Sequence, residues 1–76
     1  MTQPKVQEDG PALKITPASN GDVVRVRLRD GSYSEVTGGA GGTFLQPWGV
    51  SLLRAGIAAV EYRDPFQRWG AIWTAR

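Results

Sequence analysis

Apolar and polar side chains alternate strictly along residues 24–29. A side-chain period of two is what a half-buried β-strand requires. The alternating residues are Val24, Val26 and Leu28 on one side and Arg25, Arg27 and Arg29 on the other. The next dipeptide, Asp30-Gly31, suits the centre of a type I′ hairpin turn, so we expect residues 32–37 to form the returning strand. The pattern predicts a β-hairpin with one apolar and one basic face.

A two-residue turn at Asp30-Gly31 would place Leu28 opposite Tyr33, so that Tyr33 shares the apolar face. The three arginines would then form a stripe on the other face. One interpretation is a solubilising outer face that discourages edge-to-edge aggregation. The alternative is a docking stripe for phosphates or for an acidic protein.

The last part of the chain predicts a second hairpin, with strands at residues 57–63 and 67–74. Its turn, Asp64-Pro65-Phe66-Gln67, has proline at the second position of a type I turn. This register places Arg63 opposite Arg68. Phe66 at the turn tip, with these two arginines beside it, has the composition of a protein contact or of a stacking platform for a nucleic-acid base.

Between the hairpins, Pro47 suits the first position of a helix and Gly56 the position just after its end. We therefore expect one short helix at about residues 47–55. A competing interpretation extends this helix to Tyr62, at a cost of about 1 kcal/mol for Gly56 in its interior.

Two segments are expected to be irregular. Residues 1–21 contain Pro4, Pro11 and Pro17, which favours a flexible N-terminal arm. One interpretation is that part of it docks along a sheet edge or onto a partner, and the alternative is a disordered tail. Residues 38–42 contain four glycines and predict a hinge. A phosphate-binding loop is disfavoured there because the Gly-Lys-Ser/Thr ending is absent.

These elements predict a mostly β fold with two β-hairpins and one short helix between them. Residues 22–76 would pack as a single small β-rich domain, either a small sheet or a partly open SH3-like barrel, after the extended arm. A chain of 76 residues buries only about 60% of its unfolded surface and is marginally stable. Because the chain has no cysteine, no disulfide adds to that stability.

The composition argues against catalysis. The chain has no histidine or cysteine, which removes the commonest general base and the usual zinc ligands, and its 7 acidic residues are scattered singly. We therefore expect no enzyme activity, no cofactor, no metal and no small-molecule substrate. No stretch approaches the roughly 18 apolar residues of a membrane span. The expectation is a protein of the cytoplasm, without membrane contact.

Two functions remain open. The favoured one is a non-catalytic protein-interaction or structural module that docks on a protein partner or on copies of itself. By analogy of size and layout only, small bacteriophage accessory proteins that decorate a virion or inhibit a host system fit this description. The alternative is a small nucleic-acid-binding β-barrel that uses the arginine stripe, although a net charge of +2 is low for such a protein. The candidate binding residues are Arg25, Arg27, Arg29, Tyr33, Arg63, Phe66 and Arg68.

Overall fold

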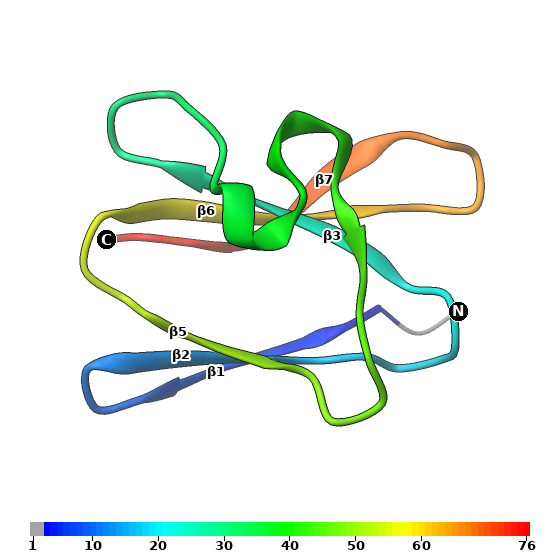
Figure 1. The fold of residues 1–76 in the computed structure, drawn as a ribbon, viewed down its shortest axis with the longest axis horizontal. Helices are drawn as coiled ribbons and strands as arrows, with labels where there is room; N and C mark the ends of the chain where they lie inside the picture. The colour runs from blue at the N-terminus through cyan, green and yellow to red at the C-terminus, as the bar shows by residue number, and fades with distance from the viewer. Residues whose placement is uncertain (1–2) are drawn as a thin grey trace.

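The computed structural model describes residues 3–76, and within them it contains seven strands in two antiparallel sheets (Figure 1). The strands are β1 (Lys5–Asp9), β2 (Ala12–Thr16), β3 (Val23–Leu28), β4 (Thr43–Phe44), β5 (Val50–Leu53), β6 (Ile57–Arg63) and β7 (Trp69–Thr74). Two 3-10 turns, η1 (Glu35–Thr37) and η2 (Gly39–Gly41), lie between β3 and β4. The predicted mostly β class is confirmed, and the sheets stay open instead of closing into a barrel.

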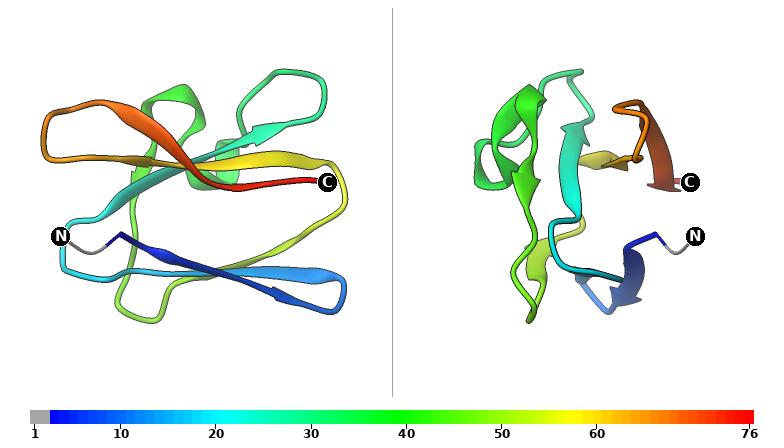
Figure 2. Two further views of the ribbon diagram at one scale, coloured as in Figure 1. Left: turned by 180° about the vertical axis from the view of Figure 1, so that it is seen from behind. Right: turned by 90° about the vertical axis from the view of Figure 1, so that its right-hand side faces the viewer.

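The two sheets lie against each other and enclose the core between them (Figure 2). Their strand orders are β1-β2-β5 and β4-β3-β6-β7. Residues 45–49 join β4 to β5 along one side of the two sheets. Along the opposite side, β1 lies beside β7 but is not hydrogen-bonded to it as a strand. The fully buried large apolar side chains are Leu13, Ile15, Val24, Val26 and Val60.

The expected N-terminal arm is instead a β-hairpin over most of its length, and residues 1–2 of it lie outside the described residues. β1 and β2 pair with Asp9 opposite Ala12, which leaves Gly10 and Pro11 as the turn. Gly10 has a φ of +57°, and glycine at the first central position suits a type II′ turn. Proline does not disrupt this hairpin because a turn residue has no ladder hydrogen bond to donate.

The first predicted hairpin turns with three residues instead of two. The N–H of Leu28 donates to Ser32 O at 2.8 Å, and the N–H of Gly31 donates to Leu28 O at 3.0 Å. Arg27, and not Leu28, therefore lies opposite Tyr33. The predicted register is wrong by one residue, and a shift of one residue moves a side chain to the other face. Tyr33 lies on the arginine side.

The predicted register of the second hairpin is also wrong by one residue. Ile57–Arg63 is a strand as predicted, so the helical alternative for it is wrong. The loop, however, has three residues and ends at Gln67, whose φ is +66°, the usual left-handed third position of such loops. Arg63 consequently lies opposite Trp69 and not opposite Arg68.

Two further predicted elements are wrong. Residues 32–37 do not return as a strand, because the chain turns into η1 after Ser34. The Thr37 side chain is buried and its Oγ1 accepts from the N–H of Val26 at 3.2 Å, which takes the place of strand pairing. Residues 47–55 form no helix and instead contain β5, which pairs with β2.

Candidate functional site

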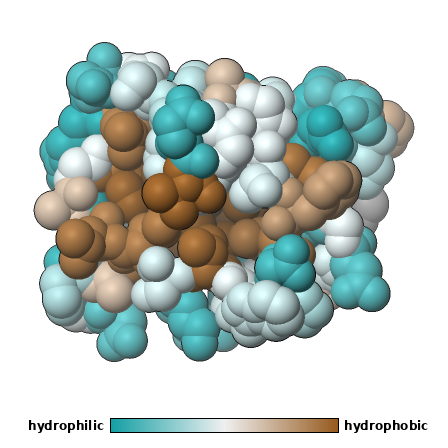
Figure 3. All heavy atoms as spheres, viewed as in Figure 1, coloured by the Kyte–Doolittle hydropathy of each residue, from teal (hydrophilic) through white to brown (hydrophobic). Residues whose placement is uncertain are grey.

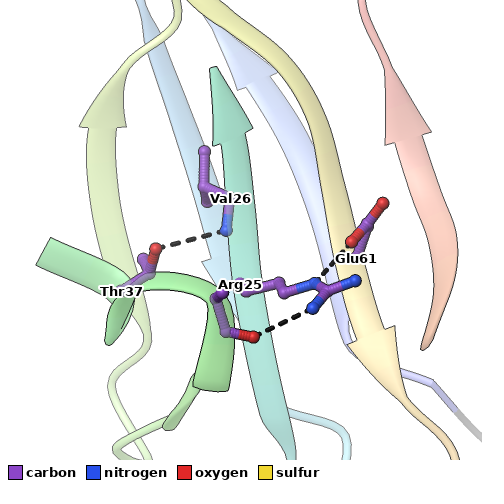
Figure 4. Close-up of polar contacts among 5 residues, drawn as sticks. Arg25, Val26, Thr37 and Glu61 are labelled. Carbon is purple, nitrogen blue, oxygen red and sulfur yellow. Dashed lines mark hydrogen bonds and ion pairs between the residues drawn. The ribbon is translucent and has the colours of Figure 1, made fainter. Parts of the chain in front are cut away.

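Arg25 is held on the outer face of the larger sheet by four neighbours. Its guanidinium lies 4.4 Å from the ring centroid of Tyr33 and 4.2 Å from that of Trp69. Its Nε donates to Glu61 Oε1 at 2.6 Å and its Nη1 to Ala40 O at 2.9 Å (Figure 4). The Arg25 and Glu61 side chains are only 16% and 14% exposed. Arg25 therefore ties η2 to the sheet and has little surface left for a ligand.

The predicted arginine stripe is not one surface. Arg27 is exposed on the same face as Arg25. Arg29 follows the end of β3, and its N–H donates to Gly56 O at 2.9 Å. Its side chain lines a different part of the surface, beside Glu8 and Trp73. The structure thus brings together Arg25 and Tyr33 but separates them from Arg29.

Phe66 is exposed at the tip of the β6–β7 hairpin, as its predicted role as an anchor requires, with 71% of its surface accessible. Arg68 lies over its ring at 5.6 Å and pairs with Asp64 at 3.6 Å. Arg63 is half-buried on the neighbouring strand. Of the three predicted residues at this tip, Phe66 and Arg68 are in contact.

A continuous band of apolar side chains crosses the face that carries β4, β5 and the two 3-10 turns (Figures 1 and 3). Val36, Phe44 and Trp48 are 71%, 65% and 73% exposed on this face. They border a groove of about 290 Å³. The groove is lined by Val36, Thr37, Thr43, Phe44, Leu45, Gln46, Trp48, Gly49 and Val50, none of which is charged. We call this set the aromatic groove.

The free edge of β5 begins at the aromatic groove. The N–H of Arg54 donates to Pro11 O at 2.8 Å, and hydrogen-bonded pairs alternate along an antiparallel ladder. Ser51 and Leu53 therefore direct their backbone N–H and C=O groups away from β2, on the edge of the three-stranded sheet. β5 has no charged residue, proline or bulge. Apart from its short length of four residues, β5 lacks the features by which edge strands resist pairing with another chain.

A second concavity lies at the end of the molecule where β7 approaches β1. Glu8 joins two neighbours there: its Oε1 accepts from Arg54 Nη1, and its Oε2 accepts from Trp73 Nε1 at 3.1 Å. The hydrogen bond from Trp73, with the larger effect, and that from Arg54 hold the pKa of Glu8 below its ordinary value of 4.5. The bond from Trp73 links β1 to β7, and the bond from Arg54 links β1 to the β5–β6 connection.

The hydrogen bonds of Glu8 make the stability of the fold depend on pH in a definite direction. Because the pKa of Glu8 is lower in the folded state, its stabilisation is present above about pH 4.5 and is lost as the pH falls through the folded-state pKa. We expect Glu8→Gln to lower the free energy of unfolding near pH 7 and to leave a smaller acid-induced loss between pH 5 and 3. Urea unfolding at several pH values measures both. An unchanged pH profile in Glu8→Gln would show that the Glu8 pairing is not populated in solution.

The sequence reasoning missed the aromatic groove and the residues around Glu8. One signal for the groove is present in the sequence: Phe44 and Trp48 lie on either side of Pro47, in a segment bounded by Gly42 and Gly49. Proline and glycine interrupt the regular strand or helix pattern by which large aromatic side chains are buried. No comparable signal joins Glu8 to Trp73, which are 65 positions apart.

Among residues 3–76, no group of three or more acidic residues is placed to hold a metal ion. Over the same residues, no helix has the length and apolar character that crossing a membrane demands. No family model, curated protein or solved structure matches this chain.

Proposed function

We propose that the chain is a non-catalytic protein-interaction module, and that its aromatic groove docks a second copy of the same chain. The observation that carries this proposal is the exposure of Val36, Phe44 and Trp48 around one uncharged groove. Contiguous exposed apolar surface on a small domain marks a contact surface. Aromatic side chains, tryptophan above all, dominate the binding energy of such contacts.

Self-association is favoured because the same face carries a projecting aromatic side chain and a groove that can receive one. Trp48 projects into solvent and the groove lies beside it, so a twofold axis would let each Trp48 enter the groove of the other copy. No charged side chain lines the groove, so like charges do not meet there. The free β5 edge begins at Val50 in the same groove and offers backbone groups for pairing to the second copy.

The molecule has enough surface for such a contact. A specific interface buries about 800 Å² on each partner, which is roughly a sixth of the 4795 Å² accessible surface of the chain. Burial of this apolar face also supplies stability that a chain of 76 residues has difficulty in obtaining alone.

Sedimentation velocity over protein concentrations up to about 1 mM tests the proposal. We expect a reversible monomer–dimer equilibrium in the unmodified chain. Trp48→Ala should weaken the dimer roughly a thousandfold, because a central tryptophan contributes about 2 kcal/mol or more and the twofold axis places one Trp48 in each of the two grooves. Its matched control is Phe66→Ala, since Phe66 is exposed to a similar extent but lies at the β6–β7 tip, and this variant should leave the dimer unchanged.

Two outcomes would contradict the proposal. A chain that stays monomeric up to the highest concentration has no self-contact of this kind. A dimer that Phe66→Ala weakens and Trp48→Ala does not would place the contact at the hairpin tip, as the sequence prediction for Phe66 has it.

A further inference from the structure

The concavity around Glu8 has the size and composition of a ligand site that is separate from the aromatic groove. Its volume is about 600 Å³, within the range of sites for small organic molecules. It is formed by the end of β1, the turn after β3, the β5–β6 connection and the end of β7. Its lining residues combine arginine, tryptophan and small apolar side chains. We call it the end pocket.

The side chains that line the end pocket carry an excess of positive charge. Arg29, Arg54 and Arg76 line it, with Glu8 as the one acid. Arg54 is paired with Glu8, whereas the guanidinium of Arg29 makes no ion pair or hydrogen bond with any residue from 3 to 76. The side chains therefore sum to +2, the charge that a phosphomonoester dianion neutralises. Arginine also offers the planar, bidentate geometry that suits phosphate oxygens.

Trp73 contributes an aromatic ring to the wall of the end pocket. Its Nε1 donates to Glu8 at 3.1 Å, and this hydrogen bond fixes the orientation of the indole. The side chain is half-buried, because it packs against the core while it also lines the pocket. Leu53 and Pro11 add apolar surface. A flat ring attached to the anion would stack or pack on this wall, since indole faces bind aromatic rings and bases.

We propose that the end pocket binds a phosphomonoester carried on a flat ring, of the kind that a nucleoside 5′-monophosphate presents. Arg29 pairs with the phosphate, and Trp73 packs against the ring. Arg54 and Glu8 hold the indole and the pocket wall in place. This site uses none of the residues of the aromatic groove and shares only Leu53 with the free β5 edge, so a monomeric chain would still contain it.

NMR titration of the intact, isotope-labelled chain with adenosine 5′-monophosphate at pH 7.5 tests the proposal. We expect saturable shifts at the Trp73 indole N–H and around Arg29. Adenosine alone and inorganic phosphate alone should each bind at least about tenfold more weakly, because each lacks one half of the recognised group. A 5′-phosphorylated oligonucleotide, compared with its unphosphorylated form, shows whether a strand end also supplies the ligand.

The pH dependence reports the charge of the ligand. The second ionisation of a phosphomonoester has a pKa near 6, and the chain has no histidine that titrates in this range. Affinity should therefore fall between pH 7.5 and 5.5. An affinity that stays constant over this interval would overturn recognition of the dianion.

Arg29→Gln is the decisive variant, and Arg27→Gln is its matched control, because both arginines are exposed and only Arg29 lines the pocket. Arg29→Gln should weaken binding of the nucleotide about tenfold or more, since it removes a charge-assisted contact. Arg27→Gln should change the affinity less than twofold. Equal weakening by the two variants would indicate diffuse attraction to a basic chain, and the absence of shifts at Trp73 would place any binding elsewhere. Either result overturns the proposal.

Discussion

Leu13→Ala is expected to lower the free energy of unfolding by about 2–5 kcal/mol, which is the range for truncation of a fully buried leucine. Leu13 has no exposed surface and packs in the core with Val24 and Val60, which belong to the other sheet. The substitution removes apolar contacts on both sides of the core and leaves a cavity between the sheets. The loss is a large part of the total, since domains have about 5–15 kcal/mol of stability.

Urea unfolding followed by circular dichroism measures this loss, with Lys14→Ala as the control. Lys14 is the next residue on β2 and is exposed, so its truncation should change the free energy of unfolding by about 0.5 kcal/mol or less. If Leu13→Ala were as stable as Lys14→Ala, the N-terminal hairpin would not be part of the core. The interpretation of residues 1–21 as a flexible arm would then be restored.

Gly42→Ala is expected to lower the free energy of unfolding by a similar amount, for a different reason. Gly42 has a φ of +74° and a ψ of 174°, a backbone region that is essentially restricted to glycine. A Cβ there would lie 2.5 Å from the Trp69 ring and 2.9 Å from Val23 Cγ1. Backbone strain and overpacking each cost about 1–3 kcal/mol, so we expect a total loss of about 2–6 kcal/mol.

The control for this substitution is its neighbour. A Cβ on Gly41 has no heavy atom within 4 Å, and Gly41 has no positive φ. Gly41→Ala should therefore leave stability within about 0.5 kcal/mol of the unmodified chain. Gly42→Ala should also shift the Trp69 indole resonance, because the added methyl group displaces the ring that stacks on Arg25. A folded Gly42→Ala variant with normal stability and an unshifted Trp69 would contradict the position of residues 38–42 against the sheet.

The sequence predicts strands correctly where the pattern of apolar and polar residues extends over a long segment. The alternation in residues 24–29 predicts β3 to within one residue at each end, and Ile57–Arg63 is a strand as expected. The four residues of β5 fall within the predicted helix, because Trp48, Leu52 and Leu53 fit helical spacing as well as they fit a short strand. Four positions are too few to separate a period of 2 from one of 3.6.

The register errors have one physical cause. Both hairpin loops have three residues, and the third residue adopts a positive φ, at Gly31 in one and Gln67 in the other. Asp30-Gly31 supports a two-residue loop equally well, and Gln67 gives no warning because glutamine rarely takes this conformation. The shift moves Tyr33 and Trp69 to the face of Arg25. The aromatic enclosure of that arginine therefore could not be predicted.

The candidate site depended on these same details. A free arginine stripe required Arg25 to face solvent, whereas Glu61, Tyr33 and Trp69 surround it. The aromatic groove arises because the sheets stay open beside β5 and because η1 carries Val36 to that side. Tertiary arrangement of this kind is not encoded in any local pattern of the chain.

Contact between two copies through Trp48 is the central functional claim, and an isotope-filtered NOE experiment tests it most directly. The sample is an equal mixture of labelled and unlabelled chains at a concentration where sedimentation shows a dimer. We predict intermolecular NOEs from the Trp48 indole protons to the methyl groups of Val36 and the ring of Phe44. Intermolecular NOEs confined to Phe66, or none at all from Trp48, would contradict the claim.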